Sequence, residues 1–515
     1  MSSDEETAWP FKSQGGRKRQ KKFVSLIATL LTMSVGLASL LSGIAEGQNQ
    51  DDPRDLLLRA RENVLGTIER LPRYLCTQTV DRSRYRPPEQ SASTSHARSC
   101  DDIIAEARRA NRARRLFSSD RLRFDVAVNA SVPGEVGEMY SWAGEERFGD
   151  RDLFEFVHDG SISTGSFSSM LASIFGQNIA RFSYSGDSFV NGRVLSEYRF
   201  RIAQEKSRYT YVFGNGPSKQ AIMAYDGSIL VDSQTADLVR LVIRSDQLPT
   251  ETGACELTQT LDYGRVRLHD ADFLLPKEVR VSVIHTDGSE AENQIQYSAC
   301  REFRSKSVIR FPASERGEAS PSGGAEPVSQ FLLPPGLPFK VVFTDSIDTV
   351  TAAAGDPVRG KLETAIRDRS SNVLVPEGTP VTGRITSIRR YYEGSSSHLS
   401  GGQNDSADAG WATILSGPQT PNPDTRNIES GQPPLILEIR LESLSIDGAP
   451  RPLNAAFSSG LRRFSKSKGK LPKRVEIGSL DSAQDPNAGR FEFWETSHSY
   501  VIKSGLESNW VTLSR

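Results

Sequence analysis

The chain has 515 residues, with 63 Lys and Arg against 64 Asp and Glu and a formal net charge of -1. This length predicts more than one domain, and the balanced charge argues against the overall basic character that draws a protein onto nucleic acid. A hydrophobic fraction of 37%, with 41 Gly and 27 Pro, is compatible with turn-rich β-domains.

The N-terminal 45 residues carry the pattern of an export signal. A basic cluster at 17–22 precedes an apolar run, Phe23–Ala45, that contains no charge. Positive charge stays on the cytoplasmic side while an apolar segment enters the bilayer. The run is long enough to span a membrane and ends in small residues that suit cleavage near Ala45. We therefore expect a periplasmic or extracytoplasmic protein, either released by cleavage or anchored in the membrane by residues 23–45.

Next along the chain, residues 51–72 predict an amphipathic helix that begins after an aspartate N-cap with Pro53 in its first turn and ends before Pro72. From Tyr74 onward the period changes to two, which predicts strands. These predicted strands are 74–82, 120–128, 138–144, 196–203, 207–213, 227–232, 238–245 and 277–284. Asp226-Gly227 and Asp287-Gly288 are predicted hairpin turns.

Residues 160–178 interrupt the strands with an apolar spacing that predicts a short inserted helix. Aromatic residues concentrate around it. Core packing explains most of them, but a second interpretation is a concave surface for an acyl chain or hydrophobic peptide, with the inserted helix as a plug or lid. The residues of this possible apolar ligand surface are Trp142, Phe154, Phe156, Phe167 and Phe175.

The four cysteines are Cys76, Cys100, Cys255 and Cys300. An even number in an exported chain predicts two structural disulfides. Three pairings are possible, and proximity in the sequence favours Cys76 with Cys100 and Cys255 with Cys300. No pair has the C-x-x-C spacing typical of zinc or redox sites.

Residues 312–330 have the Pro, Ser, Gly and Glu composition of a disordered linker. A second β-domain is predicted at 336–515, with a polar, breaker-rich and disordered insertion at about 394–433. Its segment GDPVRGKLET begins at Gly355 and resembles a phosphate-binding loop, but Leu362 stands where that loop needs a hydroxyl. The alternation that follows predicts a turn and a strand, and no nucleotide site.

No residue pattern supports catalysis or a cofactor. The six histidines are scattered, so they predict no metal site, and no G-x-S-x-G motif is present. We expect neither catalytic nor cofactor-binding nor metal-ligating residues, and no enzymatic activity. An exported hydrolase remains the less favoured alternative.

The phrases AYDGSILVDSQTADLVRLVI and FLLPKEVRVSV, within residues 51–310, resemble the LolA-like and RseB-like envelope proteins. This resemblance implies a half-barrel, an antiparallel curved sheet packed on a helix, whose concave side handles acyl chains or senses envelope components. More faintly, NVLVPEGTPVTGRI and LILEIRLESLSIDG resemble the β-barrel module of TrbI-type secretion proteins. The expected fold class is mainly β with a few helices (α+β), with a second small β-barrel-like domain.

The expected function is that of a non-enzymatic bacterial cell-envelope protein. It would bind a lipid, an acyl chain or a protein partner through a concave sheet, and would contact the membrane through its N-terminal segment. The alternative is a structural component of an envelope or secretion complex. Neither nucleic acid nor nucleotide is an expected partner.

Overall fold

A computed structural model describes the chain from Asp52 to Ser514 with gaps. The described residues are 52–88, 98–110, 114–132, 135–145, 148, 153–157, 162, 166, 169–176, 180–213, 219–245, 248–302, 332–392, 435–460, 464–465, 473–477, 487–493 and 501–514. The predicted leader 1–45, linker 312–330 and insertion 394–433 lie outside them. No helix in the described part of the chain is long and apolar enough to cross a membrane.

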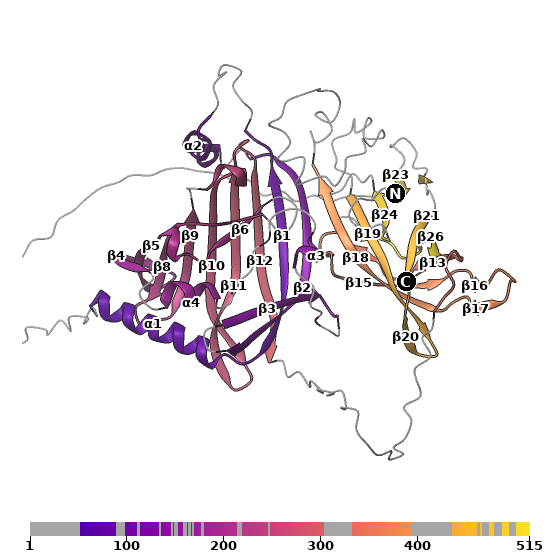
Figure 1. Ribbon diagram of the computed structural model, residues 1–515, viewed down its shortest axis with the longest axis horizontal. Coiled ribbons are helices and arrows are strands. Elements are labelled where there is room, and N and C mark those ends of the chain that lie inside the picture. The colour runs from indigo at the N-terminus through magenta and orange to yellow at the C-terminus, as the bar shows by residue number, and fades with distance from the viewer. Residues whose placement is uncertain are drawn as a thin grey trace, which may run out of the picture. The chain divides into compact units, whose positions relative to one another are not determined.

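The predicted mainly β fold is confirmed, and its first part is a curved antiparallel sheet of ten strands in which β3 and β4 are the edges (Figure 1). In spatial order the strands are β3 (Glu135–Trp142), β2 (Leu116–Val132), β1 (Tyr74–Tyr85), β12 (Glu290–Glu302), β11 (Ala271–His285), β10 (Ala254–Leu268), β9 (Leu238–Ser245), β8 (Tyr225–Asp232), β5 (Arg193–Ile202) and β4 (Arg181–Val190). A separate hairpin pairs β6 (Thr210–Val212) with β7 (Gln220–Ile222).

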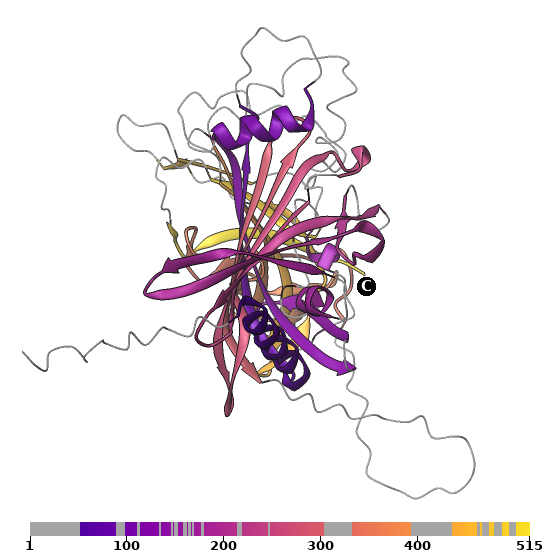
Figure 2. The ribbon, with the colours of Figure 1, turned by 90° about the vertical axis from the view of Figure 1, so that its left-hand side faces the viewer.

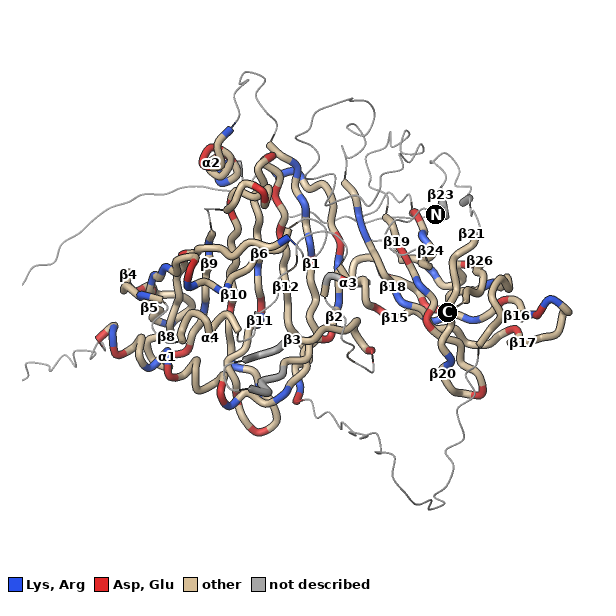
Figure 3. The backbone as a smooth tube through the Cα atoms, viewed as in Figure 1, with Lys and Arg blue, Asp and Glu red and all other residues tan. Residues whose placement is uncertain are grey.

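One face of this sheet carries the main apolar core and packs on α1 (Pro53–Arg70), α3 (Leu153–Phe156) and α4 (Ser169–Phe175). The other face is mostly polar, and α2 (Cys100–Ala110) packs there against Ile284 of β11, which alternates with Val281 and Val283 of the opposite face. Asp52 caps α1 as the sequence predicts, because its side chain accepts a hydrogen bond from the Arg54 N–H. Figure 3 shows charged residues of both signs along the strands. Ion pairs such as Arg240–Asp262 and Arg265–Asp237 lie among them.

A second group of strands buries a separate apolar core around Trp510 and Phe491. Its main ladder runs through β24 (Gly489–Phe493), β19 (Leu435–Ile446), β18 (Pro380–Tyr391), β15 (Pro357–Leu362), β13 (Pro338–Phe343), β26 (Leu506–Thr512) and β21 (Ala455–Gly460). No pairing among the described strands closes this ladder into a barrel.

Shorter strands complete this part. They are β14 (Ile347–Asp348), β16 (Ile366–Arg367), β17 (Val373–Val375), β20 (Ala449–Pro452), β22 (Phe464–Ser465), β23 (Lys473–Ile477) and β25 (Val501–Ile502). Short 3-10 helices, Gln204–Lys206 and Thr250–Thr252, lie in the first part. The TrbI-type assignment and the predicted domain limits stay predictions.

Two disulfides join cysteines far apart in the sequence, Cys76 with Cys300 and Cys100 with Cys255. The pairing favoured by proximity is therefore wrong. Its physical reason is strand order, because β1 pairs with β12, which brings Cys76 beside Cys300. Cys100 begins α2, which packs on β10 and β11 next to Cys255.

The predicted turn at Asp226-Gly227 is also wrong. Both residues lie inside β8, where Asp226 pairs with Arg244 and Gly227 with Ile243. The dipeptide has the composition of a turn, but β8 pairs with β5 on one side and β9 on the other, and this pairing keeps both residues extended. By contrast, Gly288 adopts the positive φ of 84° expected at the Asp287-Gly288 turn between β11 and β12.

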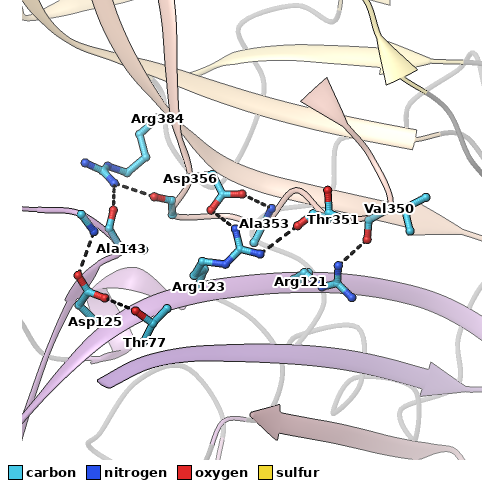
Figure 4. A network of polar contacts seen from close by, with 12 residues as sticks. Thr77, Arg121, Arg123, Asp125, Ala143, Val350, Thr351, Ala353, Asp356 and Arg384 are labelled. Atoms are coloured by element: carbon cyan, nitrogen blue, oxygen red, sulfur yellow. Dashed lines mark hydrogen bonds and ion pairs between the residues drawn. The ribbon is translucent and has the colours of Figure 1, made fainter. Parts of the chain in front are cut away.

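The segment Val350–Asp356 joins β2 to the second group of strands (Figure 4). Ala354 donates its N–H to the Arg121 carbonyl at 2.8 Å and accepts from the Arg123 N–H at 2.7 Å. The Arg123 side chain pairs with the carboxylate of Asp356 and donates to the Thr351 carbonyl at 3.0 Å. The GDP turn of GDPVRGKLET is thus a junction, and β15 follows it as the predicted strand.

Two further contacts fasten this junction. The Arg384 guanidinium donates to the carbonyls of Ala143 at 2.9 Å and Gly355 at 2.7 Å. At the other end, β18 pairs with β2 through Arg389–Asp120, Arg390–Ser119 and Tyr391–Ser118. Strand β2 therefore pairs with strands of both groups.

Gly355 is a point where the junction tolerates no side chain. Its φ is 106°, and an added Cβ would lie 2.1 Å from the Arg123 carbonyl oxygen and 2.8 Å from the Trp142 ring. Gly378 also has a positive φ, of 82°, but nothing lies within 4 Å of the position that its Cβ would take. Both glycines therefore have a positive φ, but only Gly355 has other atoms close to the position that a Cβ would take.

We predict that Gly355→Ala lowers the free energy of unfolding by about 2 kcal/mol more than Gly378→Ala does. Both substitutions place alanine at positive φ, at a cost of about 1–2 kcal/mol, but only the first meets backbone. Urea denaturation of the two variants and the wild type measures the difference. Equal losses of unfolding free energy in the two variants would contradict this prediction, because they would show that the backbone around Gly355 moves to accept a Cβ without further loss of stability.

Candidate functional site

The candidate site is the helix-covered face of the first sheet, which we call the concave face. The apolar core there is contributed by every second residue of the central strands, for example Cys76 and Val80 of β1 and Phe124 and Val126 of β2. Figures 1 and 2 show α1 lying across one end of these strands, while α2 lies at the other end. The concave face is thus covered in its lower half by α1 and α4.

Helix α1 is the longer part of this cover. It has 18 residues and buries Leu56, Ala60, Val64 and Ile68, which recur every four residues. The Tyr198 hydroxyl on β5 donates to the Pro53 carbonyl at 2.7 Å, which fixes the amino end of the helix to the sheet. The Asp52 N-cap, the buried apolar residues and the hydrogen bond from Tyr198 together fix the position of α1 on the sheet.

Helices α3 and α4, which we call the cover helices, are much shorter. Helix α4 has seven residues and buries Met170, Leu171, Ile174 and Phe175. A helix of this length has little stability of its own. Its position therefore depends on packing and on a hydrogen bond of 3.3 Å from the Arg61 side chain to the Gly176 carbonyl at its end.

Between α1, α4 and β11 lies a small apolar cavity. It is lined by Val64, Thr67, Ile68, Leu71, Leu171, Leu274 and Leu275, and its volume is about 10 Å³. That is about enough for one water molecule, whereas a site for a small-molecule ligand needs some 300–1,000 Å³. In this conformation the cavity is too small for an acyl chain.

The structure brings together two of the five aromatic residues predicted to form an apolar surface. The rings of Trp142 and Phe156 make a T-shaped contact with centroids 5.1 Å apart, and Trp142 stacks on Phe124 at 4.8 Å. Phe175 lies elsewhere, stacked on Phe182 at 5.6 Å. Trp142, Phe156 and Phe175 are all buried. Phe167 and the side chain of Phe154 lie outside the described residues, so the ligand surface stays a prediction.

A polar cluster that the sequence did not single out adjoins this apolar region. It consists of Tyr74, Tyr140, Tyr263, Tyr297 and Glu138, on four different strands. The Tyr140 hydroxyl donates to the Glu138 carboxylate at 2.6 Å, and the Tyr263 hydroxyl lies 3.5 Å from the Ser166 carbonyl. Tyrosines in strands are common, so only the strand register could have revealed the cluster.

The register places these side chains on the concave face. Tyr74 pairs with Val128, which in turn pairs with Glu138. Likewise Cys76 pairs with Val126, and Val126 with Tyr140. Directly paired residues of an antiparallel sheet share a face, and Val126 and Val128 belong to the concave core.

Burial raises the pKa of all four phenols, and the negative charge of Glu138 contributes to each rise. For Tyr74 and Tyr140 the pKa lies well above its ordinary value. The four hydroxyls are therefore neutral hydrogen-bonding groups at physiological pH. No group of three or more His, Cys, Asp or Glu in the described part of the chain could hold a metal ion.

No protein family model matches this sequence, and no curated protein matches it. Among solved structures, an outer membrane lipoprotein-sorting protein domain from Vibrio parahaemolyticus has 13% identity and a TM-score of 0.24, and covers 48% of this chain and 93% of its own. A LolA superfamily protein from Nitrosomonas europaea has 10% identity and a TM-score of 0.22, with coverages of 49% and 93%.

The complex of Pseudomonas aeruginosa MucA and MucB gives 13% identity and a TM-score of 0.15, covering 89% of this chain and 93% of that one. The structure has the architecture that the sequence resemblance implies, a curved antiparallel sheet packed on a helix.

We predict that the buried tyrosines ionise only when the protein unfolds. Their folded-state pKa values exceed the unfolded value of about 10, so the folded state binds these protons more tightly. The stability they contribute is fully present below pH 10 and is lost as the pH rises above it. Absorbance at 295 nm and circular dichroism, followed together against pH, should change in one transition.

The matched variant is Tyr263→Phe, which removes one buried phenol and should make the loss of stability above pH 10 less steep. A reversible titration of all 13 tyrosines near pH 10 with unchanged circular dichroism would contradict the assignment of these phenols to a closed core.

Proposed function

We propose that this chain is an exported, non-enzymatic protein of the bacterial cell envelope that binds an apolar ligand, a lipid or acyl chain, on the concave face of its first sheet. The observation that carries the proposal is the unequal cover of that face. Part of the apolar face is covered by a helix of seven residues, which is held by apolar packing and by one hydrogen bond from the Arg61 side chain.

The extracytoplasmic location is supported by the cysteines. All four are joined in disulfides, and such bonds persist in oxidising compartments such as the periplasm. The basic cluster and apolar run at 17–45 support export independently. Whether this run is cleaved or retained is a separate question, which the N-terminal residue of the mature protein answers.

Binding would require the cover helices to leave the concave face. The cavity beside Leu171 is where the opening would start, because it already lacks packing atoms on one side. A ligand chain would then replace the apolar contacts of Leu171, Ile174 and Phe175 with its own methylene groups. The exchange of one apolar surface for another costs little hydrophobic free energy.

We predict that Leu171→Ala increases the affinity for a fluorescent long-chain acyl probe by about tenfold. The substitution weakens the docking of α4 by about 2–4 kcal/mol, so the open state is more populated and the probe meets less competition. Fluorescence titration of delipidated protein measures the affinity, and mass spectrometry of native protein identifies any lipid that copurifies.

The control is Leu437→Ala, which removes the same side chain from the second core, where Leu437 is fully buried. It should cost similar stability and leave probe binding unchanged. Native protein without copurified lipid, together with no probe binding by the wild type or by Leu171→Ala, would refute the proposed function.

A second candidate is a structural component of an envelope complex, and one observation favours it. Strand β4 pairs only with β5 among the described strands, and its hairpin exposes Phe189 (75%), Val190 (43%) and Val194 (38%). An exposed edge strand with apolar side chains can accept a strand from another protein.

For this candidate we predict that Phe189→Asp reduces chemical crosslinking to a partner in envelope extracts at least several-fold. The control is Leu58→Asp, at another exposed apolar residue, on α1 (55%). A wild-type chain that gives no crosslinked product would count against an assembly role.

A further inference from the structure

The side chain of Gln78 is the most unusual buried group of the concave face. It lies in the middle of β1 and is 0% exposed. Neither its amide nitrogen nor its amide oxygen has a hydrogen-bond partner among the described residues. A buried amide without partners costs on the order of 1–3 kcal/mol, so an apolar residue would give a more stable closed protein.

The strand register shows where this amide lies. Gln78 pairs with Phe124 of β2 on one side and with Tyr297 of β12 on the other. Phe124 stacks on Trp142, which contacts Phe156 of cover helix α3. Gln78 is therefore placed between the aromatic residues under the cover and the polar cluster.

The same row of β1 connects Gln78 to the small cavity. Tyr74 precedes Gln78 by four residues on the same face, roughly 13 Å along the strand, and Leu71, a cavity residue, lies three residues before Tyr74 in the chain. An acyl chain that began at the cavity could run along β1 and bring a polar head to Gln78. Cys76 lies between the two on the same face, where its disulfide to Cys300 fixes β1 against β12.

The charges nearby limit what that head can be. Glu138 is close enough to raise the pKa of all four tyrosines of the polar cluster, including Tyr297, which pairs with Gln78. A negatively charged head beside Tyr297 would be repelled as well, and the cation four residues along the same face of β1, Arg82, is already paired with Asp120. The Gln78 amide offers one acceptor and two donor hydrogens. An uncharged head that also both donates and accepts hydrogen bonds, such as an amide, is complementary to it.

We propose that Gln78 is the recognition residue of a subsite for the uncharged, hydrogen-bonding head of an amphiphilic ligand, and that it selects such heads over carboxylates. This inference rests on the proposed function, because the head can reach Gln78 only when the cover helices are displaced. The tyrosine hydroxyls of the polar cluster line the adjoining part of the path. The head of the ligand would then supply the hydrogen-bond partners that the Gln78 amide lacks in the closed protein.

The test compares oleamide with oleate, which share one chain and differ only in the head. Both are titrated by calorimetry into the full chain and into its Gln78→Met variant, which keeps the side-chain volume and removes both hydrogen-bonding groups. We expect the wild type to bind oleamide at least tenfold more tightly than oleate. In Gln78→Met, oleamide should lose that advantage, while oleate binding is unchanged.

The control is Gln296→Met, at an exposed glutamine next to Tyr297 on the opposite face of β12. It makes the same chemical change away from the concave face and should leave the preference intact. A second measurement needs no ligand. Gln78→Met should raise the melting temperature of the unligated protein, because a buried amide without partners is replaced by an apolar group.

The outcomes separate the subsite from the proposed function. If oleamide and oleate bind equally well, and Gln78→Met changes neither, ligand binding stands and the Gln78 subsite is refuted. Binding of neither amphiphile would overturn both. A lower melting temperature for Gln78→Met would show that the amide has stabilising partners in the closed protein, and would contradict the inference.

Discussion

Burial of the apolar concave face of the first sheet determines how helices α1, α3 and α4 of this structure are arranged. Ten strands curve without closing, so their inner face must be covered by something other than the sheet itself. One part of the cover, α1, has a capped end, a regular apolar stripe and a bond from Tyr198. The other part, α3 and α4, consists of short helices that exist only because they are packed.

The sheet under this cover is held from two directions. The disulfide between Cys76 and Cys300 links the beginning of β1 to the end of β12, and the second, between Cys100 and Cys255, attaches α2 at the other end of the strands (Figure 1). The junction at Gly355 and Asp356 adds the second group of strands to β2. A rigid sheet with a weakly held cover can open in one place without losing its fold.

Local patterns in the sequence were enough to predict α1, most strands and the strand in GDPVRGKLET, because each depends on the period of a few neighbouring residues. The disulfide pairing and the β2–β18 contact were not predictable in this way, since both depend on strand order. The turn predicted at Asp226-Gly227 was wrong because the composition of these two residues favours a turn, whereas the pairing of β8 with β5 and β9 keeps them in a strand. Alternation places Gln78 on the same face as Cys76 and Val80, but the sequence cannot show that its buried amide has no hydrogen-bond partner, because that depends on neighbouring strands.

The proposed function requires that the cover helices leave the concave face more easily than the rest of the core unfolds. Native-state hydrogen exchange, followed by mass spectrometry, measures this difference. We expect peptides containing 169–176 to exchange at least tenfold faster than those containing α1 and β1, and a bound amphiphile to change their rate most. Equal protection of α4, α1 and β1, with all three opening together, would contradict it.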